Sequence, residues 1–268
     1  MGTPTTTLDD VVADLRVEHD ALDVLVAGLD AQGWDLPTPA PGWAVRDQIS
    51  HLAFFDDAAV MAIDDPEGFG AMAEAAMAAD GDPMAEHLRQ GREMDGHDLL
   101  EWWRTARAGL LERAAGLDPR ARVVWFGPPM GAISFVSARL METWAHGQDV
   151  VDALGVSRSA TARLRHVAHL GVRARPFSYV VRGRELPEGS VFVSLDPPGG
   201  GAPWTWGEDG GDSVQGSAEE FCLVVTQRRN LADTSLVVEG LLAEEWMAIA
   251  QAFAGPPGPG RAPRGGGD

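Results

Sequence analysis

Two side chains that can coordinate a metal ion stand four residues apart in the segment ETWAHGQDV, residues 142–150. If this segment is helical, Glu142 and His146 lie one turn apart and point to the same side. A carboxylate and an imidazole in that arrangement can hold a divalent cation. A solvated Glu–His pair on a helix surface has the same spacing, so the pair alone leaves both interpretations open.

A three-ligand site needs a further group from another helix, and His51 is the best candidate. It follows PGWAVRDQIS (41–50) and lies among the apolar positions of an amphipathic segment, where a histidine can also be an ordinary core residue. His166 and His169 form another possible pair, but the surrounding arginines would repel a cation. The remaining histidines sit among acidic residues and are expected at the surface: His19, His87 and His97.

Residues close to these candidates could support a site or simply stabilise the fold. Asp149 lies three residues after His146 and could orient a ligand or act on an approaching group. Asp47, four residues before His51, could do the same or cap the start of its helix. Two tryptophans could line a pocket or belong to the core, Trp43 and Trp144.

Two features further along the chain also bear on chemistry. Arg228 and Arg229 are adjacent at the end of an expected helix, where a guanidinium could bind a carboxylate of a substrate or thiol. The helix dipole favours cations at this position as well, so both interpretations stay open. The single cysteine, Cys222, falls on an apolar helix face and is expected in the core, which excludes an internal disulfide and a cysteine-rich zinc site.

The periodicity of apolar residues predicts the elements that position these groups. Helices are expected over 7–32, 44–63, 97–115, 132–153 and 160–180. Thr7 and Asp10 are expected to cap the start of the first of them. Short irregular helices are expected over 66–95. Gly155 is expected to end the helix that carries Glu142. The segment 118–131 breaks the helical pattern with Pro and Gly. The first two-thirds of the chain is therefore predicted to be a helical bundle.

The sequence changes character after Gly183. Short β-type runs alternate with Gly/Pro turns over 190–216, SAEE (217–220) fits a capping box, and a strand and a final helix are expected over 234–240 and 241–253. We predict an α+β protein with a helical bundle over 1–183, a small α+β domain over 184–254 and a disordered Gly/Pro-rich tail over 255–268.

The composition narrows the classes of function. The 268 residues include 21 basic and 40 acidic side chains, and the formal net charge of −19 disfavours nucleic acid and anionic membranes as partners. No membrane span or secretory signal is expected, so we predict a cytoplasmic protein. Arginine supplies every basic residue, which excludes lysine chemistry and is typical of a GC-rich genome such as that of an actinobacterium. The sequence does not specify an oligomeric state.

Two stretches resemble a known family. GWAVRDQISHLAFFD (42–56) and ETWAHGQDVVDALG (142–155) are similar to the DinB-like metal-binding four-helix bundles, and most closely to their mycothiol-dependent maleylpyruvate isomerase branch. The similarity covers about 7–180 and extends to VQGSAEEFCLVVTQRRN (214–230), which resembles that branch's second domain. The resemblance implies a DinB-like four-helix bundle followed by a small C-terminal α+β domain.

The resemblance also implies a site. By analogy with the family, His51, Glu142 and His146 coordinate a divalent metal, usually zinc, with an open coordination position. In members that use a thiol cofactor, that position can take the thiolate. We therefore expect an enzyme that uses a mycothiol-type thiol to transfer to, or isomerise, a small electrophilic substrate. Further roles are assigned to three residues: Asp149 in catalysis, and Arg228 and Arg229 in catalysis and cofactor binding.

Two alternative functions remain open. The metal could be purely structural, in a protein that binds a ligand or partner without catalysing a reaction. The protein could instead be a metallohydrolase, in which Asp149 or Asp47 acts as the base.

Overall fold

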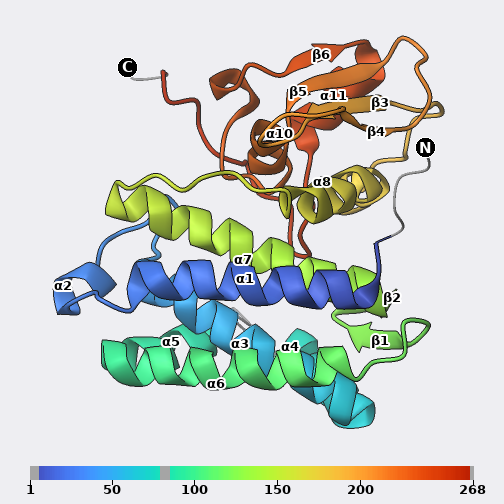
Figure 1. Cartoon of the computed structure of the whole chain (residues 1–268). Helices are drawn as coiled ribbons and strands as arrows, with labels where there is room; N and C mark the ends of the chain where they lie inside the picture. Colours follow the sequence, from blue (N-terminus) through green and yellow to red (C-terminus); the bar gives the residue numbers. More distant parts are fainter. Residues whose placement is uncertain (1–5, 79–84, 266–268) are drawn as a thin grey trace. The chain divides into compact units, whose positions relative to one another are not determined.

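The computed structural model describes residues 6–78 and 85–265. Contacts within the chain divide it into two compact units, Met1–Arg158 and Ser159–Asp268. The first unit is mostly helical, and the second combines helices with a small sheet (Figure 1). None of the described helices combines the length and the apolar character that a membrane span requires.

Long helices build the first unit. They are α1 (Leu8–Val26), α3 (Val45–Asp64), α6 (Gly96–Ala115) and α7 (Ala132–Leu154). Helices α1 and α3 each pack against both α6 and α7 (Figure 1). Each helix contributes buried apolar side chains to one core, which includes Leu22, Ile49, Trp103 and Val150. The helical bundle predicted from the sequence is confirmed.

Local sequence explains where these helices begin and end. Thr7 caps the start of α1 as expected, and it forms a full capping box with Asp10. Gly155 follows α7 with φ +64°, a left-handed conformation that glycine adopts without steric cost. The helix expected over 7–32 stops earlier, because the side chain of Asp30 accepts a hydrogen bond from Gly33 N–H and starts a separate short helix, α2 (Ala31–Trp34).

Shorter elements connect the long helices. The region 66–95, expected to be irregular, forms the regular helices α4 (Pro66–Ala78) and α5 (Ala85–Glu93), while residues 79–84 lie outside the described part. The Pro/Gly segment before α7 folds into an antiparallel hairpin of β1 (Arg122–Trp125) and β2 (Gly127–Gly131).

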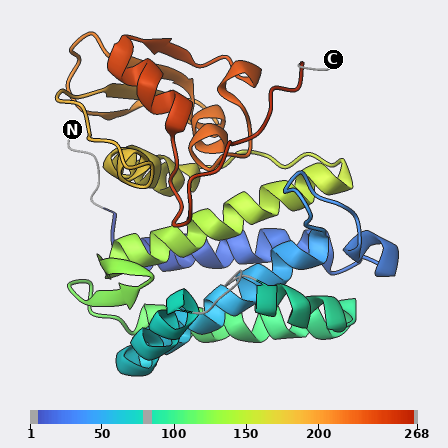
Figure 2. The same cartoon turned by 180° about the vertical axis from the view of Figure 1, so that it is seen from behind.

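The second unit contains a four-stranded sheet in the order β4-β3-β5-β6. Its strands are β3 (Phe192–Asp196), β4 (Trp204–Trp206), β5 (Ser213–Ser217) and β6 (Val237–Glu239). Strand β3 pairs antiparallel with β4 and parallel with β5, and β5 pairs antiparallel with β6. The helices of this unit are α8 (Leu164–Arg173), α9 (Arg175–Val180), α10 (Ala218–Val225) and α11 (Leu241–Ile249), with a 3₁₀ turn at Leu231–Asp233. Figure 2 shows α11 in red, alongside the sheet.

The start of α10 differs in detail from the expected capping box. Ser217 accepts a hydrogen bond from Glu220 N–H, which is one half of the box. The carboxylate of Glu220 instead accepts bonds from the backbone and hydroxyl of Ser235, at 3.1 and 2.8 Å. Glu220 therefore ties the helix to the chain that leads into β6.

The helix expected over 160–180 is divided and belongs to the second unit. It breaks between α8 and α9, where Pro176 stands at the start of α9 and has no N–H to donate. Helix α8 packs so closely on α10 that a Cβ added to Gly171 would lie 2.7 Å from Val225. This packing groups 159–183 with the sheet, whereas the sequence had suggested a boundary at 183.

The Gly/Pro-rich tail has no helix or strand in its described part, which ends at Gly265. The composition predicts a disordered tail, and two of its described residues, Arg261 and Arg264, form hydrogen bonds to the rest of the second unit. Asn230 donates to the carbonyl of Arg261 at 2.8 Å, and Arg264 N–H donates to Asp233 at 2.9 Å. The last three residues of this predicted tail, 266–268, lie outside the described residues.

Candidate metal centre

Helices α3 and α7 bring the three predicted ligands together. His51 comes from α3, and Glu142 and His146 come from successive turns of α7. One potential ligand atom from each residue lies within 4.8 Å of the other two. Nε2 of His146 is 3.2 Å from a carboxylate oxygen of Glu142, and the rings of His51 and His146 have centroids 4.4 Å apart. The two helices also pack against each other, so this cluster lies where they meet.

A hydrogen-bonded chain fixes the orientation of His146. The carbonyl oxygen of Trp43 can only accept, so Thr38 donates its hydroxyl hydrogen there, at 3.0 Å. The Thr38 hydroxyl then accepts from Nε2 of Gln48 at 2.9 Å, which places Oε1 of Gln48 2.6 Å from Nδ1 of His146. Since this oxygen accepts, Nδ1 carries a hydrogen, and Nε2, 3.2 Å from Glu142, is the nitrogen that can bind a proton or a metal ion between the two side chains.

Sequence reasoning missed Gln48. The available signal was its position three residues before His51, which places both side chains on one face of α3. Ligating histidines commonly donate their other ring N–H to such a partner, and the partner sets both tautomer and ring angle. Gln48 therefore supplies the support that a metal-ligating His146 needs.

Asp47, by contrast, serves the fold. Its carboxylate accepts a hydrogen bond from Ala44 N–H at 2.8 Å, at the start of α3. Nε of Arg92 donates to the same carboxylate at 2.8 Å. Of the two roles open for Asp47, the structure shows capping of the helix.

Aromatic rings flank both histidines of the cluster. The ring of Trp43 stacks on His146, with centroids 5.9 Å apart and an interplanar angle of 17°. The ring of Phe55 lies 4.6 Å from that of His51 and contacts Phe126 of the β1–β2 hairpin. Trp144 faces elsewhere, buried beneath the guanidinium of Arg158. Trp43 thus forms a wall of the site, and Trp144 belongs to the core.

The residues expected to take part in catalysis occupy different elements. Asp149 lies on α7, three residues after His146, and is 1% exposed. Arg228 and Arg229 belong to the second unit and lie in the turn after α10, beyond Thr226 and Gln227. Gln227 has φ +58°, and the backbone bonds from Arg228 to Leu223 and from Gln227 to Val224 close a Schellman turn there. The guanidinium of Arg228 donates to the carbonyl of Thr226 at 2.7 Å.

His19 is buried, which corrects the prediction that it lies at the surface. Its side chain is 1% exposed and packs edge-on against Trp103. Nε2 of His19 lies 3.7 Å from Asp56, whose carboxylate accepts two bonds from Arg139 at 2.9 and 3.1 Å. Burial, followed by the charges of Arg107, Arg139 and Arg16, holds the pKa of His19 well below its usual range. Of its acidic neighbours in sequence, Asp20 is exposed and Glu18 is buried in an ion pair with Arg158, whereas the imidazole of His19 turns toward Asp56.

The polar network around Asp56 is a structural feature of the bundle interior. Asp56 is fully buried, and its ion pair with Arg139 links α3 to α7. Burial raises the pKa of Asp56, and the charge of Arg139 opposes that rise. Because Arg139 lies three residues before Glu142, the pair fixes the same two helices that carry the ligands.

The other histidines belong to other elements of the chain. His169 accepts a hydrogen bond from Nε1 of Trp206 at 3.1 Å, and burial and the charge of Arg173 lower its pKa. His97 is exposed, as expected, beside Asp95 and Asp98 at the start of α6. The side chain of His87 lies outside the described part of the structure.

Cys222 is in the core, as predicted. Its thiol is fully buried and lies 3.5 Å from the carbonyl of Leu164. Burial raises its pKa well above the ordinary value, so the group stays a neutral thiol at neutral pH.

The donor set fits a divalent metal. Two imidazole nitrogens and one carboxylate oxygen match the ligands of zinc sites that keep a coordination position open for chemistry. The hydrogen bond from His146 to Gln48 leaves Nε2 as the nitrogen that can coordinate a metal. A solvated Glu–His pair on a helix surface would have no partner that fixes its imidazole in this way. The geometry therefore favours a metal site over the solvated Glu–His pair.

Comparison with known proteins gives a consistent answer. The chain is 47% identical over 251 residues to an uncharacterized protein of Mycobacterium tuberculosis, in each of two strains, covering 93% of this chain and 97% of the relative. The organism of these relatives is an actinobacterium, which agrees with the absence of lysine that is typical of a GC-rich genome.

Solved structures share the fold. The crystal structure of the mycothiol-dependent maleylpyruvate isomerase matches with a TM-score of 0.55 and 17% identity, over 84% of this chain and 92% of that one. A histidine-to-alanine mutant of that enzyme matches with a TM-score of 0.54. The family described as the mycothiol maleylpyruvate isomerase N-terminal domain matches residues 15–151, which hold all three candidate ligands. The chain belongs to this mycothiol maleylpyruvate isomerase family.

Proposed function

We propose that this protein is a metal-dependent enzyme that uses a mycothiol-type thiol to transfer to, or isomerise, a small electrophilic substrate. The observation that carries the proposal is the cluster of His51, Glu142 and His146, whose ligand atoms lie within 4.8 Å of one another. Family membership adds the thiol and the reaction class, since the family is described by its mycothiol-dependent isomerase.

The chain's own residues would hold and orient the metal. His51 and His146 offer neutral imidazole nitrogens, and Glu142 offers a negative charge that offsets part of a divalent cation's charge. Gln48 keeps His146 in the tautomer that coordinates through Nε2. When bound, zinc would supply the positive charge that lowers the pKa of a neighbouring thiol and makes it nucleophilic at neutral pH.

The thiol is assigned to a cofactor because the protein's own thiol is unsuited to the task. Cys222 is buried in the second unit, and its raised pKa keeps it protonated. An activated nucleophile needs the opposite, a lowered pKa and access to substrate.

Three further residues are proposed to act in the reaction. Asp149 would hold or move a proton, being buried one turn beyond His146 on α7. Arg228 and Arg229 would bind a carboxylate of the substrate or thiol, because a guanidinium matches carboxylate geometry.

Turnover by the full chain loaded with zinc tests this function. Mycothiol would be combined with maleylpyruvate and with a panel of alkylating electrophiles, and both isomerised product and thiol conjugates would be followed. Asp149→Asn should lower kcat by about 100-fold or more, as expected for loss of a proton-transfer group. Asp152→Asn, further along α7, is the matched control and should retain activity.

The same assay separates the alternatives. Zinc binding without any mycothiol-dependent product would contradict the thiol reaction. Hydrolysis of test esters under those conditions would then indicate a metallohydrolase, and inactivity on every substrate would indicate a structural metal.

A further inference from the structure

Aromatic side chains from two elements of the first unit gather beside His51. Phe55 lies one turn after His51 on α3, with its ring centroid 4.6 Å from that of the imidazole. Trp125 ends β1, and Phe126 follows it at the tip of the β1–β2 hairpin. The centroids of these two rings lie 6.2 and 5.6 Å from that of Phe55. Phe55, Trp125 and Phe126 together form an aromatic surface that begins at a candidate metal ligand.

Two buried rings hold this aromatic surface in place. Phe69 of α4 stacks on Trp125, with centroids 5.3 Å apart and an interplanar angle of 4°. Phe135 of α7 meets the same ring edge-on, at 5.2 Å. Phe69 and Phe135 are each 1% exposed and belong to the core. The hairpin is thus fixed against α3, α4 and α7, and a ligand on the aromatic surface would not have to order it first.

The rings of the aromatic surface itself stay accessible. Phe55, Trp125 and Phe126 are only half-buried, and so is His51 beside them. A contiguous apolar surface that is open to solvent commonly marks a place where a ligand binds. Because this one borders a candidate metal ligand, its occupant would lie where a thiol held at the metal cluster could react with it.

The cation beside the aromatic surface is already neutralised. The guanidinium of Arg139 lies 6.0 Å from the centre of the Phe55 ring. It donates to Asp56 at 2.9 and 3.1 Å, and both side chains of this pair are buried. Glu142 and a thiolate would together balance the two charges of a divalent cation, so the metal cluster would not attract an anion either.

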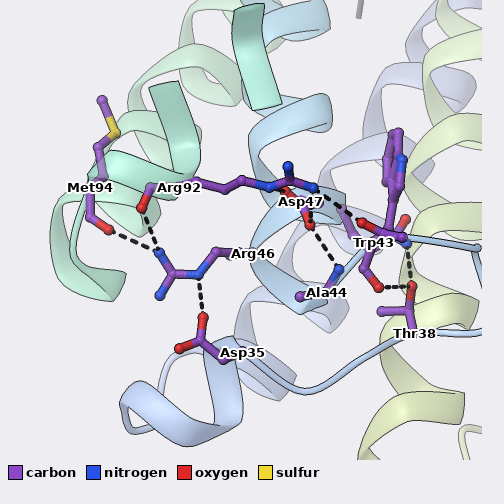
Figure 3. Close-up of polar contacts among 10 residues, drawn as sticks. Asp35, Thr38, Trp43, Ala44, Arg46, Asp47, Arg92 and Met94 are labelled. Atoms are coloured by element: carbon purple, nitrogen blue, oxygen red, sulfur yellow. Dashed lines mark hydrogen bonds and ion pairs between the residues drawn. The ribbon is translucent and has the colours of Figure 1, made fainter. Parts of the chain in front are cut away.

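The other arginines of these elements are engaged as well. Among the described residues of α3, α4, the hairpin and α7, they are Arg46 and Arg122. Arg46 pairs with Asp35 at 2.7 Å, near the start of α3 (Figure 3). Arg122 donates to the carbonyl of Pro129 across the hairpin. Within their described residues, these elements therefore offer an anionic substrate no unpaired arginine.

This surface selects an uncharged aromatic group. Stacked and edge-to-face contacts between rings favour an aromatic partner over an aliphatic one. An uncharged group also leaves no charge desolvated and unpaired against the rings. A carboxylate elsewhere on the same molecule would need a cation from outside these elements, which is the role proposed for Arg228 and Arg229.

We propose that the aromatic surface binds an uncharged aromatic ring of the electrophilic substrate, with the reacting carbon directed to His51. The role of this ring in a reaction rests on the proposed function, and it narrows the substrate to one whose reacting carbon is attached to such a ring. With a benzylic halide, the thiol would give up its proton to water or to Asp149. A C–S bond would then form as the C–halogen bond breaks, and the halide would leave with the bonding electrons.

One measurement with chemistry and one without it test the aromatic surface. Conjugation of mycothiol by the zinc-loaded full chain would be compared for benzyl bromide, allyl bromide and bromoacetate, which share one leaving group. Each rate would be divided by the rate of the same bromide with mycothiol alone, which removes intrinsic reactivity. The resulting ratio should be about tenfold higher for benzyl bromide than for allyl bromide, as for the burial of an additional ring, and lowest for bromoacetate.

Calorimetry would supply the measurement without chemistry. Its probe is 2-naphthylmethanol, an uncharged aromatic alcohol that has no leaving group. The zinc-loaded wild type should bind this probe more tightly than it binds maleate, a small dicarboxylate.

Phe126→Ala removes a half-buried ring from the tip of the hairpin. It should lower the preference for benzyl bromide and the affinity for 2-naphthylmethanol by about tenfold each. Phe126→Leu keeps apolar bulk for the fold but not the ring, and it should show a smaller loss of both. The matched control is Phe177→Ala, which removes a ring that is 37% exposed on α9 and should change neither quantity. Zinc content should be the same in all of these variants.

The outcomes distinguish the aromatic surface from the proposed function. Binding of 2-naphthylmethanol that depends on Phe126 supports the aromatic surface, even if no thiol product forms and the proposed function fails. Conjugation without a preference for benzyl bromide, or with a preference for bromoacetate, would overturn the aromatic surface and leave the proposed function intact. Equal binding of 2-naphthylmethanol by wild type and Phe126→Ala, or tighter binding of maleate by the wild type, would also overturn it.

Discussion

Oε1 of Gln48 lies 2.6 Å from Nδ1 of His146, and this hydrogen bond joins α3 to α7 beside the candidate metal ligands. It leaves the other ring nitrogen, Nε2, facing Glu142 at 3.2 Å. One hydrogen bond thus sets both the tautomer and the ring angle of a proposed ligand.

Replacing Gln48 by Leu should weaken zinc binding by about 10- to 100-fold, because His146 loses the partner that orients it. Competition with a chromogenic chelator would measure the change. Gln48→Glu keeps an oxygen for Nδ1–H and should retain most of the affinity, and Gln32→Leu, on the surface of α2, should have no effect. Equal zinc affinity in Gln48→Leu and wild type would show that the bond does not support a ligand.

The buried pair of Asp56 and Arg139 should matter far more than an exposed one. Arg139→Met leaves a carboxylate buried without its partner, which should lower the free energy of unfolding by about 3–5 kcal/mol. The double variant Asp56→Leu/Arg139→Met should lose less than the two single variants added together, because it leaves no buried charge.

Urea unfolding at neutral pH would measure these changes. Arg113→Met breaks the exposed pair with Asp64 and should leave the free energy of unfolding nearly unchanged, because solvent screens exposed ion pairs. If Arg139→Met proved no more costly than this control, the ion pair would not be buried as described.

His19 should make the protein sensitive to mild acid. Its pKa is held well below the ordinary value by burial and by nearby arginines, whereas a histidine in the unfolded chain titrates near pH 6.5. Below that pH the unfolded state binds a proton that the native state does not. Stability should therefore fall as the pH drops, by up to about 1.4 kcal/mol per pH unit from this residue.

Unfolding free energies of wild type and His19→Gln between about pH 7.5 and 5 would isolate this contribution. The unfolding free energy should depend less steeply on pH in His19→Gln, because unfolding of this variant takes up about one proton fewer. His97→Gln, which removes a histidine that is 82% exposed, should keep the wild-type slope. Parallel curves for wild type and His19→Gln would contradict a buried, neutral His19.

Cys222 should not react in the folded protein, because the thiol is fully buried and its pKa is raised. Ellman's reagent should label it only after denaturation, and Cys222→Ala should keep any mycothiol-dependent activity. Rapid labelling of the native protein would reveal a thiol within the chain itself and weaken the case for a cofactor thiol.

The parts that could be predicted from the sequence depend on local spacing. Glu142 and His146 share a face because they are four residues apart, and Thr7 and Gly155 mark helix ends by their own conformational preferences. His51 could be proposed because it lies on an amphipathic helix, and the family resemblance joined it to the pair. These features need no knowledge of how distant segments pack.

The parts that were missed depend on contacts between distant segments. Gln48 and His146 are 98 residues apart, and no periodicity relates them. The acidic neighbours Glu18 and Asp20 predict a surface position for His19, yet its side chain meets Asp56 in the core. The grouping of α8 with α10 follows from the close packing of Gly171 on Val225, which the sequence of either helix does not reveal.

The central claim is that His51, Glu142 and His146 hold a metal on which thiol binding depends. Zinc content and mycothiol affinity, measured on wild type, His51→Ala and the exposed control His97→Ala, test it most directly. Wild type and His97→Ala should contain stoichiometric zinc and bind mycothiol, and His51→Ala should lose both. Full zinc content in His51→Ala would contradict the assignment of the ligands.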